Sequence, residues 1–209
     1  MNFNRPFLIA VTGGIASGKT LVSNWFADKD LRVLYADKIA HDVLEQPEVK
    51  SELKNIFGKE IFSENKVDRS KLGKIIFDNE SLRKKLNSIV HPQVFAEMNE
   101  IIMLAEDKYL VFEIPLLFEL GLQNAFDLTI NVSARTELRI KRILDRDGIT
   151  QDEARKRIAS QMSEFDKQKL ADINIANDGE INELYYKLEN LLPLIKKLKK
   201  KEVKKIIEI

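Results

Sequence analysis

The sequence predicts an α/β fold with a five-stranded parallel sheet flanked by helices. Short apolar runs alternate with longer segments of helical periodicity, and a glycine-rich turn joins the first apolar run to the first helix. Strands separated by helices pair in parallel through right-handed crossovers. The predicted strands are Phe7–Val11, Leu31–Ala36, Tyr109–Phe112, Leu128–Val132 and the weaker Asp172–Ala176.

Two helical segments interrupt this alternation. Residues 38–108 are too long for a single crossover and carry helical periodicity, so we expect a helical insertion. Residues 136–169 are rich in charged side chains and poor in large apolar ones, which is typical of a solvated, mobile lid. A last helix, Glu180–Leu198, is expected to pack on the sheet, with a kink or break at Pro193. We predict one domain, residues 8–208, with a core of 1–37, 109–135 and 170–209.

The composition excludes several classes of protein. With 34 Lys and Arg against 33 Asp and Glu, the chain has no global field that demands a nucleic acid or a membrane as partner. It has no cysteine, which excludes disulfides, thiolate metal sites and a cysteine nucleophile. Met1–Pro6 is polar, and no apolar run approaches the ~20 residues of a membrane span. We therefore expect a soluble, cytoplasmic protein.

A basic run ends the chain. We read it as a solvated helix end, where the helix dipole favours lysine; a nucleic-acid or membrane surface is the alternative. Its members are Lys196, Lys197, Lys199, Lys200, Lys201, Lys204 and Lys205.

The glycine-rich turn matches G-x-x-x-x-G-K-[ST] in full and lies where that motif must, between a strand and a helix. Glycines let successive N–H groups turn toward phosphate oxygens, and the following helix presents its positive end to the same anion. Lys19 would bridge the β- and γ-phosphates, and the Thr20 hydroxyl would ligate Mg²⁺. This predicts a P-loop NTPase fold that binds a nucleoside triphosphate. The residues are Gly13, Gly14, Ile15, Ala16, Ser17, Gly18, Lys19 and Thr20.

Two acidic residues follow predicted strands. Asp37 comes directly after Leu31–Ala36, where a carboxylate could take a proton from an attacking hydroxyl or steer Mg²⁺. A helix N-cap is the structural alternative for Asp37. Glu113 ends the apolar strand Tyr109–Phe112, an arrangement that would place it near the water shell of the metal.

Arginines of the predicted lid are the third feature that points to phosphoryl transfer. Arg142 and Arg146 are four residues apart, so they share a helical face, and Arg139 is nearby. Such arginines can neutralise charge on a moving phosphoryl group. An exposed helix that pairs them with Asp145 and Asp147 is the alternative.

An N-K-x-D segment and the two histidines are interpreted as having no role in guanine recognition, metal binding or triad chemistry. Asn65-Lys66-Val67-Asp68 fits the guanine-reading N-K-x-D of GTPases, but it falls too early in the chain and inside the insertion, so we treat it as chance. His41 and His91 have no plausible partners for metal or triad chemistry, which leaves structural roles or substrate contacts.

The order of these motifs resembles the dephospho-CoA kinase family from Leu8 to about Leu192. Thr12–Lys19 is close to the T-G-G-I-G-S-G-K of that family, and further matches follow in order along the chain. These are Ala36-Asp37, Phe57-Gly58, Val67-Asp68-Arg69, His91-Pro92, Pro115–Glu119, Arg142, Arg146-Asp147-Gly148, Gln161 and Asn177. The chain departs from the family pattern at four places. Ala16 stands where glycine is usual, Thr20-Leu21 where Ser-Thr is common, and Glu113 where Asp is usual. The stretch between Val132 and Arg142 is slightly longer than typical.

The resemblance implies transfer of the γ-phosphoryl of ATP to the 3′-hydroxyl of dephospho-CoA, with Mg²⁺. We expect the protein to be a monomer. It implies Asp37 as base beside catalytic Lys19 and Arg142, and the insertion 38–108 as the acceptor-binding part. Leu21, Arg146 and Asn177 would join the loop in binding ATP. Asp37, His91, Glu113 and Leu117 would contact the acceptor.

Two rival functions stay open. A kinase of the same architecture for another small acceptor, such as a nucleoside monophosphate, would differ only in the insertion. A regulatory ATP sensor would need neither Asp37 nor the lid arginines.

Overall fold

The computed structural model describes residues 5–77 and 79–201. The ends of the predicted core, including Lys204 and Lys205, lie outside the described residues, as does Asp78 of the predicted insertion. Ala36–Leu104 form one compact unit, and the chain before and after this segment forms the other. Residues 105–108, predicted as insertion, belong to the sheet unit. Ala36 and Asp37, predicted as core, belong to the inserted unit.

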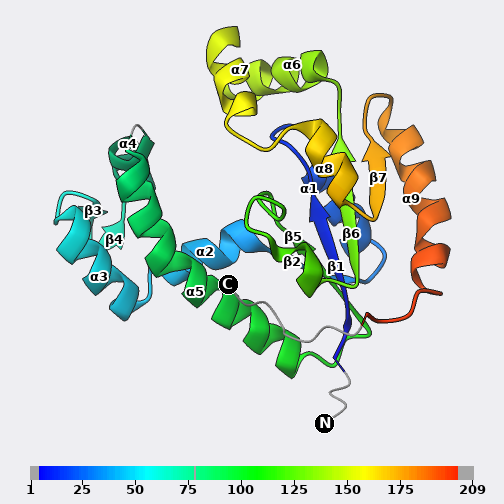
Figure 1. The fold of residues 1–209 in the computed structure, drawn as a ribbon, viewed down its shortest axis with the longest axis horizontal. Coiled ribbons are helices and arrows are strands. Elements are labelled where there is room, and N and C mark those ends of the chain that lie inside the picture. The colour runs from blue at the N-terminus through cyan, green and yellow to red at the C-terminus, as the bar shows by residue number, and fades with distance from the viewer. Residues whose placement is uncertain (1–4, 78, 202–209) are drawn as a thin grey trace. The chain divides into compact units, whose positions relative to one another are not determined.

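The larger unit is built on the predicted five-stranded parallel sheet (Figure 1). Its strands lie in the order β2-β5-β1-β6-β7. β1 is central, every one of its residues is buried, and it pairs with both β5 and β6. The turn that follows β1 therefore lies at the carboxyl edge of the sheet, where ligands of open α/β sheets bind. The strands are β1 (Phe7–Thr12), β2 (Arg32–Tyr35), β5 (Tyr109–Glu113), β6 (Leu128–Ser133) and β7 (Ile173–Ala176).

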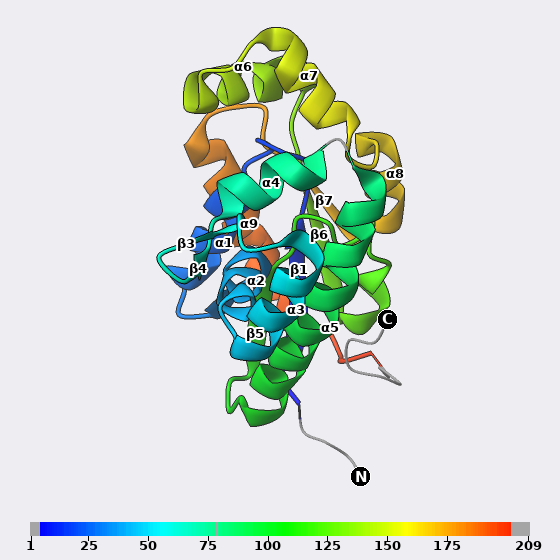
Figure 2. The same cartoon turned by 90° about the vertical axis from the view of Figure 1, so that its left-hand side faces the viewer.

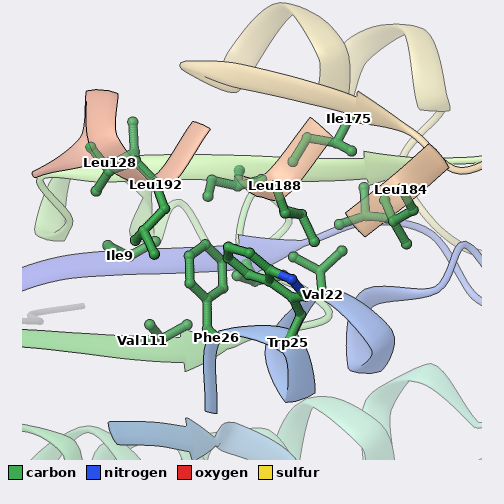
Figure 3. Packing of buried hydrophobic residues seen from close by; sticks show 14 of the residues in the cluster. Ile9, Val22, Trp25, Phe26, Val111, Leu128, Ile175, Leu184, Leu188 and Leu192 are labelled. Atoms are coloured by element: carbon green, nitrogen blue, oxygen red, sulfur yellow. The ribbon is translucent and has the colours of Figure 1, made fainter. Parts of the chain in front are cut away.

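Helices α1 (Lys19–Ala27) and α9 (Ile181–Ile195) bury their apolar stripes on one face of this sheet (Figure 3). The contributing side chains recur at helical spacing, which is why both segments form amphipathic helices. They are Val22, Trp25 and Phe26 from α1 and Leu184, Leu188 and Leu192 from α9. Of the kink or break expected at Pro193, the break is wrong: α9 continues through this proline to Ile195. Pro193 lies in the last turn of the helix, where the loss of one backbone N–H donor disturbs little of the helix.

The predicted lid contains three helices: α6 (Thr136–Asp147), α7 (Gln151–Ala159) and α8 (Glu164–Leu170). Two views place α6 and α7 beyond the carboxyl ends of β1 and β6 (Figures 1 and 2). Although polar in composition, α6 and α7 share a small core of Ile140, Ile143 and Ala154. Ile15 and Ala16 of the glycine-rich turn pack against that core, so the helical segment is anchored on the turn.

The inserted unit is mostly helical, with one short hairpin. The longest helix, α5, runs through Pro92 and buries one stripe, which includes Val90, Val94 and Met98. The elements are α2 (Ala36–Leu44), α3 (Pro47–Phe57), β3 (Phe62–Ser63), β4 (Lys66–Val67), α4 (Arg69–Phe77) and α5 (Glu80–Leu104).

The N-K-x-D segment is part of that hairpin. Glu64 and Asn65 form its turn with φ of 50° and 64°. Asp68 accepts the N–H groups of Ser70 and Lys71 at 3.0 and 3.1 Å, which makes it a cap of α4. Turn and cap chemistry explain these residue types without a nucleotide base.

The basic C-terminal run is partly bound to the sheet unit. The backbone N–H of Lys201 donates to Asp127 Oδ1 at 2.6 Å, and its ammonium lies 3.2 Å from Asp172 Oδ2. A wholly solvated helix end is therefore wrong for Lys201, because two carboxylates at the amino edge of the sheet bind it. No helix in the described part of the chain is long and apolar enough to cross a membrane.

Candidate nucleotide-binding site

The turn between β1 and α1 has the backbone that the glycine pattern predicts. Gly13 and Gly18 have φ of 147° and 102°, in the region that favours glycine. A Cβ on Gly13 would lie 2.1 Å from the Val132 carbonyl oxygen, and one on Gly18 would lie 2.1 Å from Asn177 Nδ2. Both conformation and space therefore require glycine at these two positions.

Ala16 lies in the same left-handed region, with φ of 59°. This conformation costs an L-residue about 1–2 kcal/mol. The dephospho-CoA kinase pattern has glycine here, which adopts this conformation freely, so alanine adds local strain. Contacts from the surrounding structure must therefore stabilise Ala16 in this conformation.

Lys19 is the first residue of α1 and extends back over the loop. Its ammonium donates to the carbonyl oxygens of Gly13 and Gly14 at 3.0 and 3.2 Å. This geometry holds a positive charge beside the loop N–H groups, where phosphate oxygens would lie.

Thr20 and Glu113 meet at the carboxyl ends of β1 and β5. The Thr20 hydroxyl donates to Glu113 Oε1 at 3.0 Å. Glu113 is 8% exposed, and its Oε2 is buried with no hydrogen-bond partner within the described residues. A buried orphan carboxylate oxygen fits a site completed by a hydrated cation. No group of three or more His, Cys, Asp or Glu in residues 5–77 and 79–201 could hold a metal by itself, so such an ion would need ligand oxygens from a nucleotide.

Arg142 and Arg146 differ in their contacts, although they share a helix. Arg142 donates to the carbonyl oxygens of Ala16 at 3.2 Å and Asn177 at 3.1 Å, so its guanidinium joins the loop to the end of β7. Arg146 is exposed and pairs with Asp147 at 2.7 Å. Arg146 thus makes the exposed ion pair of the alternative, whereas Arg142 contacts the loop.

Asn177 is buried directly beneath the loop. Its Nδ2 donates to the Ser17 carbonyl oxygen at 2.8 Å, and its backbone N–H donates to the Ser133 carbonyl oxygen at 2.8 Å. The side chain thus ties the loop to the last two strands. Leu21, which follows Thr20 on α1, is 37% exposed.

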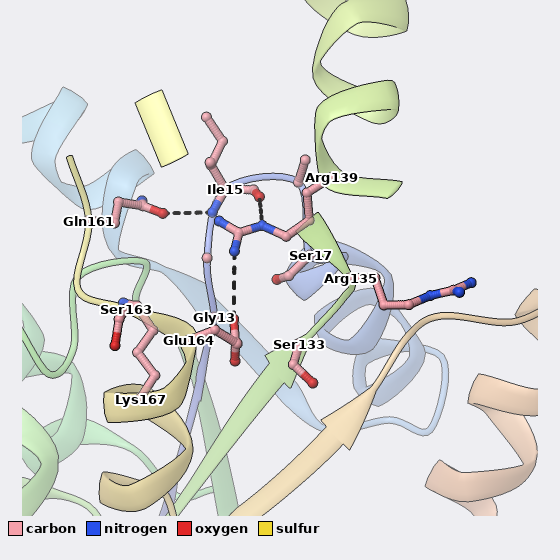
Figure 4. Close-up of polar contacts among 12 residues, drawn as sticks. Gly13, Ile15, Ser17, Ser133, Arg135, Arg139, Gln161, Ser163, Glu164 and Lys167 are labelled. Carbon is pink, nitrogen blue, oxygen red and sulfur yellow. Dashed lines mark hydrogen bonds and ion pairs between the residues drawn. The ribbon is translucent and has the colours of Figure 1, made fainter. Parts of the chain in front are cut away.

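Arg139, which the sequence places only near the other lid arginines, lies against the loop at Ile15 (Figure 4). Arg139 is 4% exposed, its Nε donates to the Ile15 carbonyl oxygen at 2.9 Å, and Glu164 Oε2 lies 3.8 Å from its Nη1. Burial lowers the pKa of Arg139, and the Glu164 carboxylate opposes that shift. The Gln161 side chain accepts the Ile15 N–H at 2.7 Å.

The remaining predicted residues are placed as follows. Asp37 is exposed in the first turn of α2, so it lies within the helix and the N-cap alternative is wrong. His91 lies half-buried on α5 with its ring 5.9 Å from that of Phe95. Both belong to the inserted unit. Leu117, which follows β5 in the chain, is fully buried, which gives its predicted contact with the acceptor no support.

A G-x-x-x-x-G-K-[ST] loop between a buried strand and a helix, with two arginines of α6 bonded to it, defines the class of protein: this is a P-loop kinase. Comparison with known proteins narrows the class. The family model described as dephospho-CoA kinase matches residues 7–183. The chain belongs to the dephospho-CoA kinase family.

Individual relatives agree with this family. A Fusobacterium nucleatum protein named dephospho-CoA kinase is 39% identical over 189 residues, which cover 90% of this chain and 98% of the relative. The solved dephospho-CoA kinase from Campylobacter jejuni is 31% identical, with a TM-score of 0.62 over 90% of this chain and 96% of that one. A solved Thermus thermophilus protein is 32% identical, with a TM-score of 0.80 over 90% of this chain and 97% of that one.

Proposed function

We propose that this chain transfers the γ-phosphoryl group of ATP to the 3′-hydroxyl of dephospho-CoA, which gives CoA and ADP. The observation that carries the proposal is the extent of the family match, residues 7–183, which includes the whole inserted unit. Kinases of this architecture share the loop and differ in the part that binds the acceptor, so a match to the loop alone would not select the acceptor.

The chemistry needs a base for the acceptor hydroxyl. In the proposed step, the 3′-oxygen attacks the γ-phosphorus while the bond from that phosphorus to the β,γ-bridging oxygen breaks, and ADP leaves. Asp37 takes the hydroxyl proton. Lys19 and Arg142 neutralise charge on the transferring group and on the leaving oxygen.

The Thr20–Glu113 pair is the proposed place for Mg²⁺. Thr20 would supply its hydroxyl as ligand, and Glu113 would accept hydrogen bonds from the metal's water through its orphan oxygen. A bound Mg²⁺ supplies positive charge that offsets the negative charge of the phosphates. Thr20 and Glu113 would thus hold and orient two of the oxygen atoms around the ion, the hydroxyl and a water.

The inserted unit has chemistry that suits the acceptor. It contains a cavity of about 590 Å³ whose lining includes Lys50, Lys54, Lys59 and Phe62, together with Glu45, which pairs with Lys50. Dephospho-CoA carries a diphosphate and a long, partly apolar arm, which such a lining complements. His91 of α5 is a further proposed contact. The remaining proposals are that Arg146 and Asn177 contribute to ATP binding and that the protein acts as a cytoplasmic monomer.

The test is ADP release measured by a coupled assay across acceptors with Mg²⁺ and ATP. We expect release with dephospho-CoA and background rates with AMP and other nucleoside monophosphates. Release with a monophosphate in place of dephospho-CoA would overturn the acceptor and favour the rival kinase. ATP binding without release for any acceptor would indicate a sensor.

A further inference from the structure

We propose that Arg139 is a positioning residue for the phosphate-binding loop. Through the carbonyl of Ile15 it holds the loop in the shape that turns the N–H of Ala16 inward, toward the β-phosphate of a nucleotide. The inference rests on the proposed binding of ATP by this loop and is independent of the acceptor.

The peptide groups on both sides of Ile15 are fixed by side chains from the segment 136–169. Arg139 donates to the Ile15 carbonyl oxygen at 2.9 Å, and Gln161 accepts the Ile15 N–H at 2.7 Å (Figure 4). Within one planar trans peptide, the C=O and the next N–H point in opposite directions. A carbonyl held outward on Arg139 therefore directs the N–H of Ala16 into the loop.

The neighbouring peptide obeys the same rule. With the Ile15 N–H held outward on Gln161, the carbonyl of Gly14 must point inward, and it does: Lys19 Nζ donates to it at 3.2 Å. The two side chains thus set the alternate directions of two successive peptide groups. Of these two peptide groups, the one that joins Ile15 to Ala16 is the one that turns its N–H group inward, where an anion would bind.

The strained backbone of Ala16 makes the loop depend on the contacts that fix the peptide groups around Ile15. Its φ of 59° is a strained conformation for alanine, so the loop would relax if the preceding peptide could rotate. Arg139 bonds the carbonyl before Ala16, and Arg142 bonds the carbonyl of Ala16 itself at 3.2 Å. Two guanidinium groups therefore bracket the strained residue.

The position of Arg139 is itself set by the sheet. Its counter-charge is Glu164, the first residue of α8, whose Oε2 lies 3.8 Å from Nη1. Asn131 on β6 donates to the other oxygen of Glu164 at 2.8 Å. A buried guanidinium needs a paired carboxylate, and here that carboxylate is anchored to a strand. A methyl group on Gly14 would lie 2.4 Å from Nη2 of Arg139, which shows how closely the guanidinium packs on the loop.

The experiment compares the affinities of ADP and AMP in Arg139→Gln, because only ADP carries a β-phosphate. Calorimetric titration should show ADP weakened about tenfold or more, the loss expected of a hydrogen bond from a charged group, while AMP changes little. Arg139→Lys should fall between wild type and Arg139→Gln, since lysine keeps the charge but lacks the guanidinium fork. Lys141→Gln, an exposed charge loss on the same helix, should bind ADP like wild type.

Three outcomes would overturn the proposal. Equal losses of ADP and AMP affinity would assign Arg139 to the nucleoside part of the site. A lower unfolding temperature with unchanged ADP affinity in the folded protein would assign it to stability alone. The third outcome is that Arg139→Lys binds ADP as weakly as Arg139→Gln does and that AMP affinity falls by the same factor. This would show that the shape of the side chain at position 139 does not act selectively on the β-phosphate.

A second variant covers the case in which Arg139→Gln does not fold. Glu164→Gln retains the hydrogen bond from Asn131 but removes the counter-charge of Arg139, and it should lower ADP affinity selectively by a smaller factor. Wild-type affinity for ADP in this variant would overturn the proposal. If the wild-type protein itself does not prefer ADP to AMP, the loop's proposed role fails first, which separates the two failures.

Discussion

The hydroxyl of Thr20 donates to Glu113 Oε1 at 3.0 Å and joins the first turn of α1 to the carboxyl end of β5. The second oxygen of Glu113 is buried and has no hydrogen-bond partner in the part of the chain that the structure describes. Burying a carboxylate oxygen in this way costs free energy, which binding of a ligand can recover. The proposed Mg²⁺ and its water would supply the partner that this oxygen lacks.

Replacing Thr20 by Val should weaken the dependence of activity on Mg²⁺. Valine keeps the shape and removes the hydroxyl, so we expect apparent Mg²⁺ affinity to fall about 10- to 100-fold. Initial rates across a Mg²⁺ titration at saturating ATP would measure this. Thr20→Ser, which keeps the hydroxyl, is the matched control and should titrate like wild type. An unchanged titration curve for Thr20→Val would remove Thr20 from the metal site.

Replacing Asp37 by Asn should separate nucleotide binding from chemistry. Asp37 is exposed in the first turn of α2, and the amide cannot accept a proton. General-base catalysis contributes about 10²- to 10⁴-fold, so kcat should fall by that factor while ATP affinity is retained. Asp42→Asn, an exposed change on the same helix, is the control. Turnover of Asp37→Asn near that of wild type would exclude Asp37 as the base.

The local parts of the fold and site are predictable from the sequence. The loop from Gly13 to Thr20 lies within one strand–turn–helix unit, so its residue types predict that a phosphate-binding turn forms there. The parallel sheet follows from alternating strands and helices, although the placement of β5 between β1 and β2 depends on tertiary packing that no single segment encodes.

The group around Arg139 shows where sequence reasoning ends. Its members come from β6, α6 and α8, and only the packed fold brings Asn131, Arg139 and Glu164 together. One signal was available: Asn131 is a polar residue within the buried strand β6. A polar side chain in such a strand must find partners, but its sequence does not say which.

The stability of the inserted unit should depend on pH through His91. Burial lowers the pKa of His91 below its ordinary value of 6.5. As pH falls below about 6.5, the unfolded chain therefore binds a proton before the folded chain does, and stability falls. Above that pH the residue is neutral in both states and makes no pH-dependent contribution.

Replacing His91 by Gln should remove that dependence. We expect the urea midpoint of the variant to fall less than that of wild type between pH 7 and 5. At pH 8 any difference between the two proteins reflects packing on Phe95 alone, which provides an internal control. Parallel pH curves for both proteins would show that His91 does not titrate in this way.

Replacing Asp127 by Ala should destabilise the protein without changing its chemistry. Asp127 is 4% exposed, and Arg5 donates to both of its oxygens at 2.5 and 2.8 Å. The N–H groups of Leu8 and Lys201 donate to it at 2.7 and 2.6 Å. Removing the carboxylate leaves a largely buried arginine unpaired, which costs about 3–5 kcal/mol in urea unfolding.

The control for Asp127 is Asp107→Asn, which breaks the exposed pair with Arg32 at 3.2 Å and should cost about 1 kcal/mol or less. Asp127 precedes β6, whereas Gly13 follows β1, so the two lie at opposite edges of a parallel sheet. Below the unfolding transition, kcat of Asp127→Ala should therefore match that of wild type, the reverse of the result expected for Asp37→Asn. A lower kcat in fully folded Asp127→Ala would mean that the amino edge of the sheet is coupled to the loop.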